Sequence, residues 1–85
     1  MDFCEMLYIT TVADCRSITA AARKLYISQP SLSHIVSKVE QDVGVKLFDR
    51  GTSPLTITYA GEKYVETARK ILLMSDNLRK ELIDA

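Results

Sequence analysis

The sequence predicts a mainly α-helical domain with one small β-hairpin, and three observations indicate this fold class. Apolar residues recur at helical spacing in four separate segments. Only Tyr26 and Ile27 separate the second segment from the start of the third, which is short enough for a helix-turn-helix. The most β-prone runs flank a turn that contains Gly51 and Pro54. Because the chain has 85 residues, we expect at most one domain with a small core.

The first predicted helix covers residues 3–14, where one apolar face is expected: Phe3, Met6, Ile9, Thr10 and Ala13. A second helix follows in the segment RSITAAARKLY. The hydroxyl of Ser17 or of Thr19 can cap it, because a side-chain oxygen can accept from the free N–H groups of the first turn. Its inner face consists of small or aliphatic side chains, which allow another helix to approach closely: Ile18, Ala21, Ala22 and Leu25.

The third predicted helix begins at Ser28, a good N-cap, and Pro30 belongs in its first turn, where the missing N–H costs nothing. Its buried stripe follows the spacing i, i+4, i+7, i+11, through Leu32, Val36, Val39 and Val43. Gly44 ends the helix, because a left-handed residue is needed after the last turn.

The opposite face of the third helix is short, polar and mostly uncharged: Gln29, Pro30, Ser33, His34, Ser37 and Lys38. A face that only met water would favour Glu and Lys, which form helices better than serine does. Low hydroxyls and amides suit an element inserted into a groove of DNA, where they can hydrogen-bond base edges and phosphates. The alternative is that the serines merely occupy exposed positions.

A hairpin is predicted in VKLFDRGTSPLTIT, with β-prone runs at Leu47–Phe48 and Leu55–Thr58. A hairpin that follows a helix-turn-helix is a wing, and Arg50, Thr52 and Ser53 are expected at its tip, near the sugar-phosphate backbone or the minor groove. The same hairpin could close the core through its apolar residues, and both roles are compatible: Leu47, Phe48, Leu55 and Ile57.

One long helix is predicted from about Tyr59 to about Ile83, with Thr58 as its cap. A heptad-like seam runs along it: Gly61, Tyr64, Ala68, Ile71, Ser75, Leu78 and Leu82, widened by Val65 and Leu72. Such a helix is roughly 37 Å long, which exceeds what the preceding domain can cover. The uncovered stripe therefore predicts pairing with a second copy of the chain, and the alternative is that the helix folds back on its own domain.

The charges balance overall, with 11 basic and 11 acidic residues, but their distribution is uneven. The segment from residue 16 to residue 38 carries Arg16, Arg23, Lys24 and Lys38 and no acid. An anionic polymer responds to such a local patch, because the Debye length is only about 8–10 Å. The alternative is an ordinary solvated face.

Other classes of function find little support in the composition. Cys4, Cys15 and His34 lie far apart in the sequence, so we expect no metal site, and we expect no cofactor. Neither a pairing of nucleophile and base nor a phosphate-cradling glycine loop is present, so no catalytic residue is proposed. No apolar run approaches the roughly 20 residues of a membrane span, and the acidic N-terminus lacks a signal-peptide pattern. We expect a cytoplasmic protein.

The run SITAAARKLYISQPSLSHIVSKVEQDVGVKLFDR, followed by LTITYAGEKYVETARKIL, closely resembles the N-terminal DNA-binding domain of LysR-type transcriptional regulators. The most specific parts are Ala21–Ser33, Gly44–Arg50 and Leu55–Gly61, in the order and spacing of that family. The resemblance implies a bacterial winged helix-turn-helix in residues 1–58 and a linker helix for dimerisation in residues 59–85. It also implies a homodimer that binds an interrupted palindromic operator on double-stranded DNA.

The resemblance assigns roles to individual positions. Gln29, Pro30 and Ser33 match positions that contact bases or the adjoining backbone, and we add His34 and Ser37 from the same face. The residues expected at phosphates or on the wing are Arg16, Ser17, Thr19, Ser28, Ser31, Lys38, Arg50, Thr52 and Ser53. The residues expected in the dimer are Tyr64, Val65, Ala68, Ile71, Leu72, Ser75, Leu78 and Leu82.

The sequence departs from the family pattern at four positions. His34 stands where arginine is usual, and Ser53 stands where arginine is frequent in the wing. Arg16 replaces a common glycine, and Tyr26 replaces a common histidine. The neutral net charge, together with His34 and Ser53, motivates an alternative function, a winged-helix protein-interaction module that does not bind DNA.

Full-length members of the family continue into an effector-binding domain and can form tetramers. This chain is expected to end in or just after the linker helix. Any small-molecule effector is therefore expected to act through a domain outside this sequence.

Overall fold

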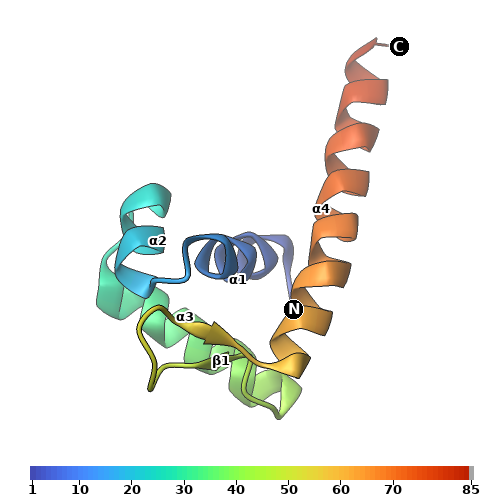
Figure 1. Cartoon of the computed structure of the whole chain (residues 1–85). Helices are drawn as coiled ribbons and strands as arrows, with labels where there is room; N and C mark the ends of the chain where they lie inside the picture. Colours follow the sequence, from blue (N-terminus) through green and yellow to red (C-terminus); the bar gives the residue numbers. More distant parts are fainter. Residues whose placement is uncertain (85) are drawn as a thin grey trace.

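The structure is a computed structural model that describes residues 1–84. Over these residues the chain forms four helices and one two-stranded antiparallel sheet (Figure 1). The elements follow in the order α1 (Phe3–Cys15), α2 (Ile18–Leu25), α3 (Gln29–Val43), β1 (Phe48–Asp49), β2 (Thr56–Ile57) and α4 (Tyr59–Asp84). The predicted winged helix-turn-helix with a long C-terminal helix is confirmed. Ala85, the last residue of the expected linker segment, lies outside the described residues.

Side chains cap the starts of the helices, as the hydroxyl pattern predicts for three of them. Ser17 rather than Thr19 caps α2, and its Oγ accepts from the Ala20 N–H at 3.1 Å. Ser28 caps α3. Thr58 Oγ1 accepts from the Gly61 N–H at 3.0 Å and donates to the Lys46 carbonyl at 2.6 Å, so it also ties α4 to the segment before β1.

The turn between α2 and α3 closes through backbone hydrogen bonds. Tyr26 takes a left-handed conformation with φ of 59°, and the Ile27 N–H donates to the Ala22 carbonyl at 3.0 Å. The sharp reversal brings α3 against α2 and α1, which is the helix-turn-helix geometry that the two-residue spacing predicts. Gly44 ends α3 with φ of 80°, the left-handed conformation expected at that position.

The core lies where α1 meets the three other helices. The largest fully buried side chains come from α1, from α3 and from the segment before β1: Ile9, Val12, Leu32, Val36, Val39 and Leu47. The hairpin also closes the core, because Phe48 and Leu55 are buried. Phe48 pairs with Ile57 across the sheet, and the Leu55 N–H donates to the Arg16 carbonyl at 3.0 Å. The wing is thereby attached to the end of α1.

The two halves of α4 have different surroundings. Its first turns pack on α1 and on the hairpin, and a Cβ at Gly61 would overlap the Leu47 carbonyl oxygen. Its far half projects away from the rest of the molecule (Figure 1). The apolar side chains there are exposed: Leu73, Met74, Leu78, Leu82 and Ile83. None of the helices within residues 1–84 combines the length and the apolar character that a bilayer crossing requires.

Three expectations about apolar faces need correction. Phe3 was expected on the inner face of the first helix, but it lies in the opening turn of α1, beyond the core, and is 56% exposed. Val65 and Ala68 were expected in the dimer seam, but both are buried against their own domain. The reason is that the near half of α4 crosses α1, which covers the part of the seam that these two residues occupy.

Candidate nucleic-acid interface

The first turns of α3 present polar groups to solvent. Gln29, Pro30, His34 and Lys38 are exposed, while Leu32 and Val36 on the opposite side anchor the helix in the core. The buried stripe therefore fixes which face of α3 points outward. This arrangement agrees with the outer face that the sequence predicts.

The serines at the start of α3 hold the first turn together. Ser28 Oγ accepts from the Ser31 N–H at 3.2 Å and donates to Ser31 Oγ at 2.7 Å. Both hydroxyls are exposed at the helix N-terminus, where the positive end of the helix dipole favours an anion. Ser28 and Ser31 are thus placed where a phosphate could be bound.

A surface depression of about 350 Å³ separates the start of α3 from the wing. It is lined by Ile18, Leu55 and seven of the residues proposed to contact DNA: Arg16, Ser17, Gln29, Ser33, Arg50, Thr52 and Ser53. Segments up to 39 residues apart in the sequence, from Arg16 to Leu55, meet here. The other proposed contacts lie outside this depression: Thr19, Ser28, Pro30, Ser31, His34, Ser37 and Lys38.

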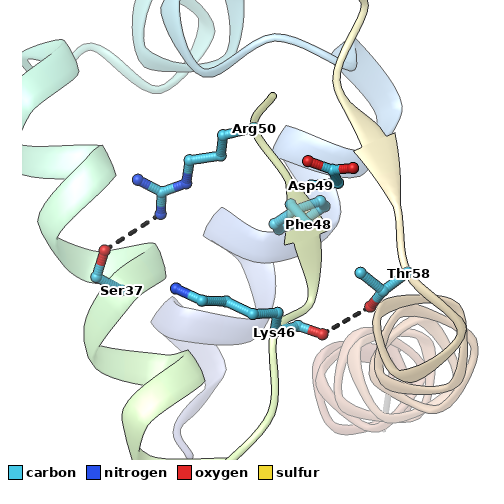
Figure 2. A pocket seen from close by; sticks show the side chains of 6 residues that line it. All are labelled: Ser37, Lys46, Phe48, Asp49, Arg50 and Thr58. Carbon is cyan, nitrogen blue, oxygen red and sulfur yellow. Dashed lines mark hydrogen bonds between the residues drawn. The ribbon is translucent and has the colours of Figure 1, made fainter. Parts of the chain in front are cut away.

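Arg50 does not extend from the wing tip as the sequence predicts. Its guanidinium turns toward α3, where Nη1 donates to Ser33 Oγ at 2.9 Å. Nη2 donates to Ser37 Oγ at 3.2 Å (Figure 2). Nη2 also lies 3.7 Å from Glu40 Oε1. The hydroxyls of Ser33 and Ser37, which were expected to contact bases, are therefore hydrogen-bonded to an arginine from the wing.

The tip of the wing is held by short-range hydrogen bonds. The Gly51 N–H donates to Asp49 Oδ1 at 2.9 Å, and the hydroxyls of Thr52 and Thr56 lie 2.7 Å apart. Ser53 is exposed beside them. With Arg50 turned inward, the tip presents hydroxyls and one carboxylate rather than a positive charge.

The basic segment divides into two groups in space. Arg16 lines the depression, and Lys38 is exposed on α3. Arg23 and Lys24 instead occupy the last turn of α2, where the negative end of the helix dipole stabilises positive charges. The structure thus places Arg16, rather than Arg23 or Lys24, beside the other proposed contacts.

Sequence reasoning missed Glu40 and Lys46. Glu40 is buried, and its Oε2 accepts from the backbone N–H groups of Leu47 and Phe48 at 2.7 and 3.3 Å. Lys46 lies 4.0 Å from Glu40 Oε1 and lines a second depression of about 440 Å³ beside Arg50 and Ser37. A signal for Glu40 was present, because it follows Val36 by four residues and so falls on the buried stripe.

No group of three or more His, Cys, Asp or Glu side chains among residues 1–84 is arranged to hold a metal ion. Cys4 is exposed on α1, and the half-buried Cys15 packs against the core. Around the first turns of α3 the exposed surface carries hydrogen-bonding groups and cations.

A family model described as "Bacterial regulatory helix-turn-helix protein, lysR family" matches residues 4–62. The transcriptional regulator ClcR of Pseudomonas putida is 40% identical over 76 residues, which cover 89% of this chain and 26% of ClcR. The regulator BudR of Klebsiella aerogenes is 43% identical over 76 residues, which cover 89% of this chain and 53% of BudR. The chain spans about a quarter of the length of the first curated relatives that it matches.

Solved structures of similar fold include complexes of DNA-binding domains with DNA. The BenM DNA-binding domain bound to benA site 1 DNA matches with a TM-score of 0.95 and 31% identity, over 99% of this chain and 94% of that chain. The complex of the CbnR DNA-binding domain with DNA matches with a TM-score of 0.91 and 31% identity, over 99% and 97% of the two chains.

Proposed function

The chain belongs to the lysR family of bacterial regulatory helix-turn-helix proteins, and on that premise we propose that it is a sequence-specific DNA-binding module of a transcription regulator. In this proposal α3 enters the major groove by its first turns, and the wing approaches the adjacent backbone. The regulators ClcR and BudR, and the DNA complexes of BenM and CbnR, support the proposal by their similarity.

The observation that carries the proposal is the depression between α3 and the wing. Its lining brings an exposed amide, an exposed arginine and several hydroxyls to one surface that includes the first residue of α3. Amides and hydroxyls can hydrogen-bond base edges, while a cation and a helix N-terminus attract phosphates. A shallow polar surface of this kind fits a nucleic acid better than it fits an apolar small molecule.

We assign base contacts to Gln29, Pro30, Ser33, His34 and Ser37, of which Ser33 and Ser37 act together with Arg50. The phosphate contacts are assigned to a larger set: Arg16, Ser17, Thr19, Ser28, Ser31, Lys38, Thr52 and Ser53. His34 is exposed at a position from which it can reach DNA, with a shorter side chain than arginine has. The module would therefore contact DNA with few fixed positive charges.

The far half of α4 is proposed to pair two copies of the chain. Leu78 and Leu82 are exposed there, and Ile71, Leu72 and Ser75 are half-buried at the edge of the domain. A dimer would cover this apolar surface and would place two copies of α3 on one face of the DNA. The operator would then be an interrupted palindrome, and regulation by an effector would require a domain beyond this sequence.

Selection of bound sequences from a random pool of DNA duplexes tests the proposal directly. The 85-residue chain is expected to enrich a sequence with two related half-sites, because each copy of α3 reads the same bases. Enrichment of no sequence, together with retention of all duplexes equally, would contradict sequence-specific recognition. Failure to retain any DNA would favour the protein-interaction module instead.

A further inference from the structure

Glu40 is a buried acid on α3 that contacts two other parts of the candidate interface. Its side chain is 4% exposed. Oε2 accepts from the N–H groups of Leu47 and Phe48, where the chain enters β1. Oε1 lies 3.7 Å from Arg50 Nη2 and 4.0 Å from Lys46 Nζ. One carboxylate therefore faces both the start and the end of the first wing strand.

The second oxygen of Glu40 depends on these cations. Among residues 1–84, Oε1 accepts no hydrogen bond, although both cations lie within ion-pair distance. A buried carboxylate oxygen without a hydrogen bond is unfavourable unless a positive charge lies close by. The Lys46 side chain is 80% exposed and largely solvated, whereas the Arg50 side chain is 35% exposed and is held on α3. Arg50 is therefore the principal cation beside Glu40 Oε1.

Arg50 in turn connects the wing with α3. Nη1 and Nη2 donate to the hydroxyls of Ser33 and Ser37, one turn apart on the outer side of α3. A guanidinium has five N–H donors in a fixed plane, so donors remain for an acceptor from outside the protein. Arg50 also lines both depressions, and Figure 2 shows the one that it shares with Ser37 and Lys46.

We propose that Glu40 is a positioning residue for DNA binding. It holds Arg50 between the wing and α3, so that the guanidinium rather than free serine hydroxyls meets the DNA at Ser33 and Ser37. This inference rests on the proposed function of DNA binding. Because Glu40 is buried, it acts on DNA through Arg50 and not by contact.

The substitution Glu40→Gln removes the charge of Glu40 but can keep its hydrogen bonds with the backbone of Leu47 and Phe48. Glutamine has nearly the same shape, and its carbonyl oxygen can still accept from Leu47 and Phe48. The amide lacks the negative charge that attracts Arg50. Asp42→Asn is the matched control, since Asp42 lies on the same helix, is exposed and makes no ion pair within residues 1–84.

The affinity of four proteins for a duplex selected by the wild-type chain tests the inference: wild type, Glu40→Gln, Arg50→Gln and the double variant. Glu40→Gln is expected to lower the affinity about tenfold, which lies within the usual range for coupled neighbours. The double variant is expected to bind like Arg50→Gln alone, because the two residues act as one unit. Asp42→Asn is expected to bind DNA at least as well as wild type, because loss of a negative charge favours a polyanion.

Circular dichroism first establishes that each variant is folded. A folded Glu40→Gln variant that binds as tightly as wild type, or more tightly, would overturn the inference, as would losses that multiply in the double variant. If the wild-type chain binds DNA and Glu40→Gln does not, the result supports the role of Glu40. If the wild-type chain binds no DNA, the result contradicts the proposed function and therefore also the role of Glu40.

Arg50→Lys provides a second test that does not depend on the folding of Glu40→Gln. Lysine keeps the charge but lacks the planar fork that reaches both serines. The expected result is about a tenfold loss of affinity with an unchanged dependence on salt, because the number of positive charges is the same. Full affinity in Arg50→Lys would overturn the inference.

Discussion

Gln29 is the residue of α3 for which we propose a base contact most directly. It is the first residue of the helix, it is exposed, and it lines the depression beside the wing. We predict that Gln29→Ala lowers the affinity for the selected duplex by roughly 1–3 kcal/mol and relaxes base preference. Lys38→Ala is the matched comparison, because loss of a phosphate contact should weaken all sequences alike and reduce the salt slope by about one. Quantitative gel shifts on selected and scrambled duplexes would contradict the base-reading role if Gln29→Ala lost equal affinity on both.

Tyr64 is a residue whose hydroxyl is buried without a hydrogen-bond partner among residues 1–84. Burial raises the pKa of Tyr64 above its ordinary value of 10.0, and the carboxylates of Glu5 and Asp2 raise it further. Tyrosine therefore ionises more readily in the unfolded chain, and the free energy of unfolding should fall as the pH rises above about 10.

The substitution Tyr64→Phe tests this stability effect. At neutral pH the variant should be as stable as wild type or slightly more stable, because it removes an unsatisfied buried hydroxyl. It should also lose part of the alkaline decrease in stability. Tyr26→Phe is the control, since Tyr26 is 94% exposed and should leave that decrease unchanged. Urea unfolding at a series of pH values measures the free energy of unfolding of both variants. Equal decreases in that free energy at alkaline pH for Tyr64→Phe and Tyr26→Phe would contradict the role of Tyr64.

Individual residues show which parts of the candidate site can be predicted from the sequence and which cannot. The outward face of α3 could be predicted, because the buried stripe through Leu32 and Val36 fixes its direction. The inward turn of Arg50 could not, since it depends on the distance between the wing and α3 and on a buried carboxylate 10 residues away. A charged residue on an apolar stripe, such as Glu40, is a signal that a partner charge should be sought elsewhere in the chain.

The elements follow from local signals where a cap or a period is present. Ser17, Ser28 and Thr58 begin helices, and Gly44 ends one, because each satisfies backbone groups that a helix terminus leaves free. The strands are shorter than the β-prone runs, because Phe48 and Asp49 pair with only two residues of the second run. Pairing depends on contacts across the hairpin, which a run of residue types does not specify.

Gly61 positions the long helix against the domain. It lies in the first turn of α4, where an added Cβ would overlap the Leu47 carbonyl oxygen and crowd Ile57. We predict that Gly61→Ala lowers the free energy of unfolding by roughly 1–3 kcal/mol, the usual cost of overpacking. Gly51→Ala is the control, because Gly51 is exposed and the nearest atom is the end of the flexible Asp49 side chain. Similar urea midpoints for Gly61→Ala and wild type would contradict this packing role.

The molecule as a whole combines a compact domain with a projecting helix. It extends 48 Å along its longest axis, and α4 accounts for the projection (Figure 1). The length of α4 and its apolar seam could be predicted from periodicity. Periodicity could not predict which part of the seam packs on the chain's own domain and which part stays exposed. Val65 and Ala68 belong to the domain, whereas Leu78 and Leu82 remain exposed, because α1 covers only the near half of α4.

The exposed part of the seam predicts the oligomeric state. Leu78→Glu should convert a dimer to a monomer, because it places a charge in the apolar surface proposed to pair. Asn77→Glu adds the same charge at the neighbouring exposed position, off the predicted seam, and should leave the dimer intact. Sedimentation equilibrium measures both, and a wild-type chain that is monomeric at high concentration would contradict the proposed dimer.

Sequence-specific recognition of DNA by the surface formed by α3 and the wing is the central claim, and the salt dependence of binding tests it most directly. The affinities of the wild-type chain for the selected duplex and for a scrambled duplex should be measured over a range of salt concentrations. We predict that both affinities fall steeply as salt rises, by a log–log slope of about −0.9 for each phosphate neutralised, and that the selected duplex stays tighter throughout. Binding that does not respond to salt, or equal affinity for the two duplexes, would contradict the claim.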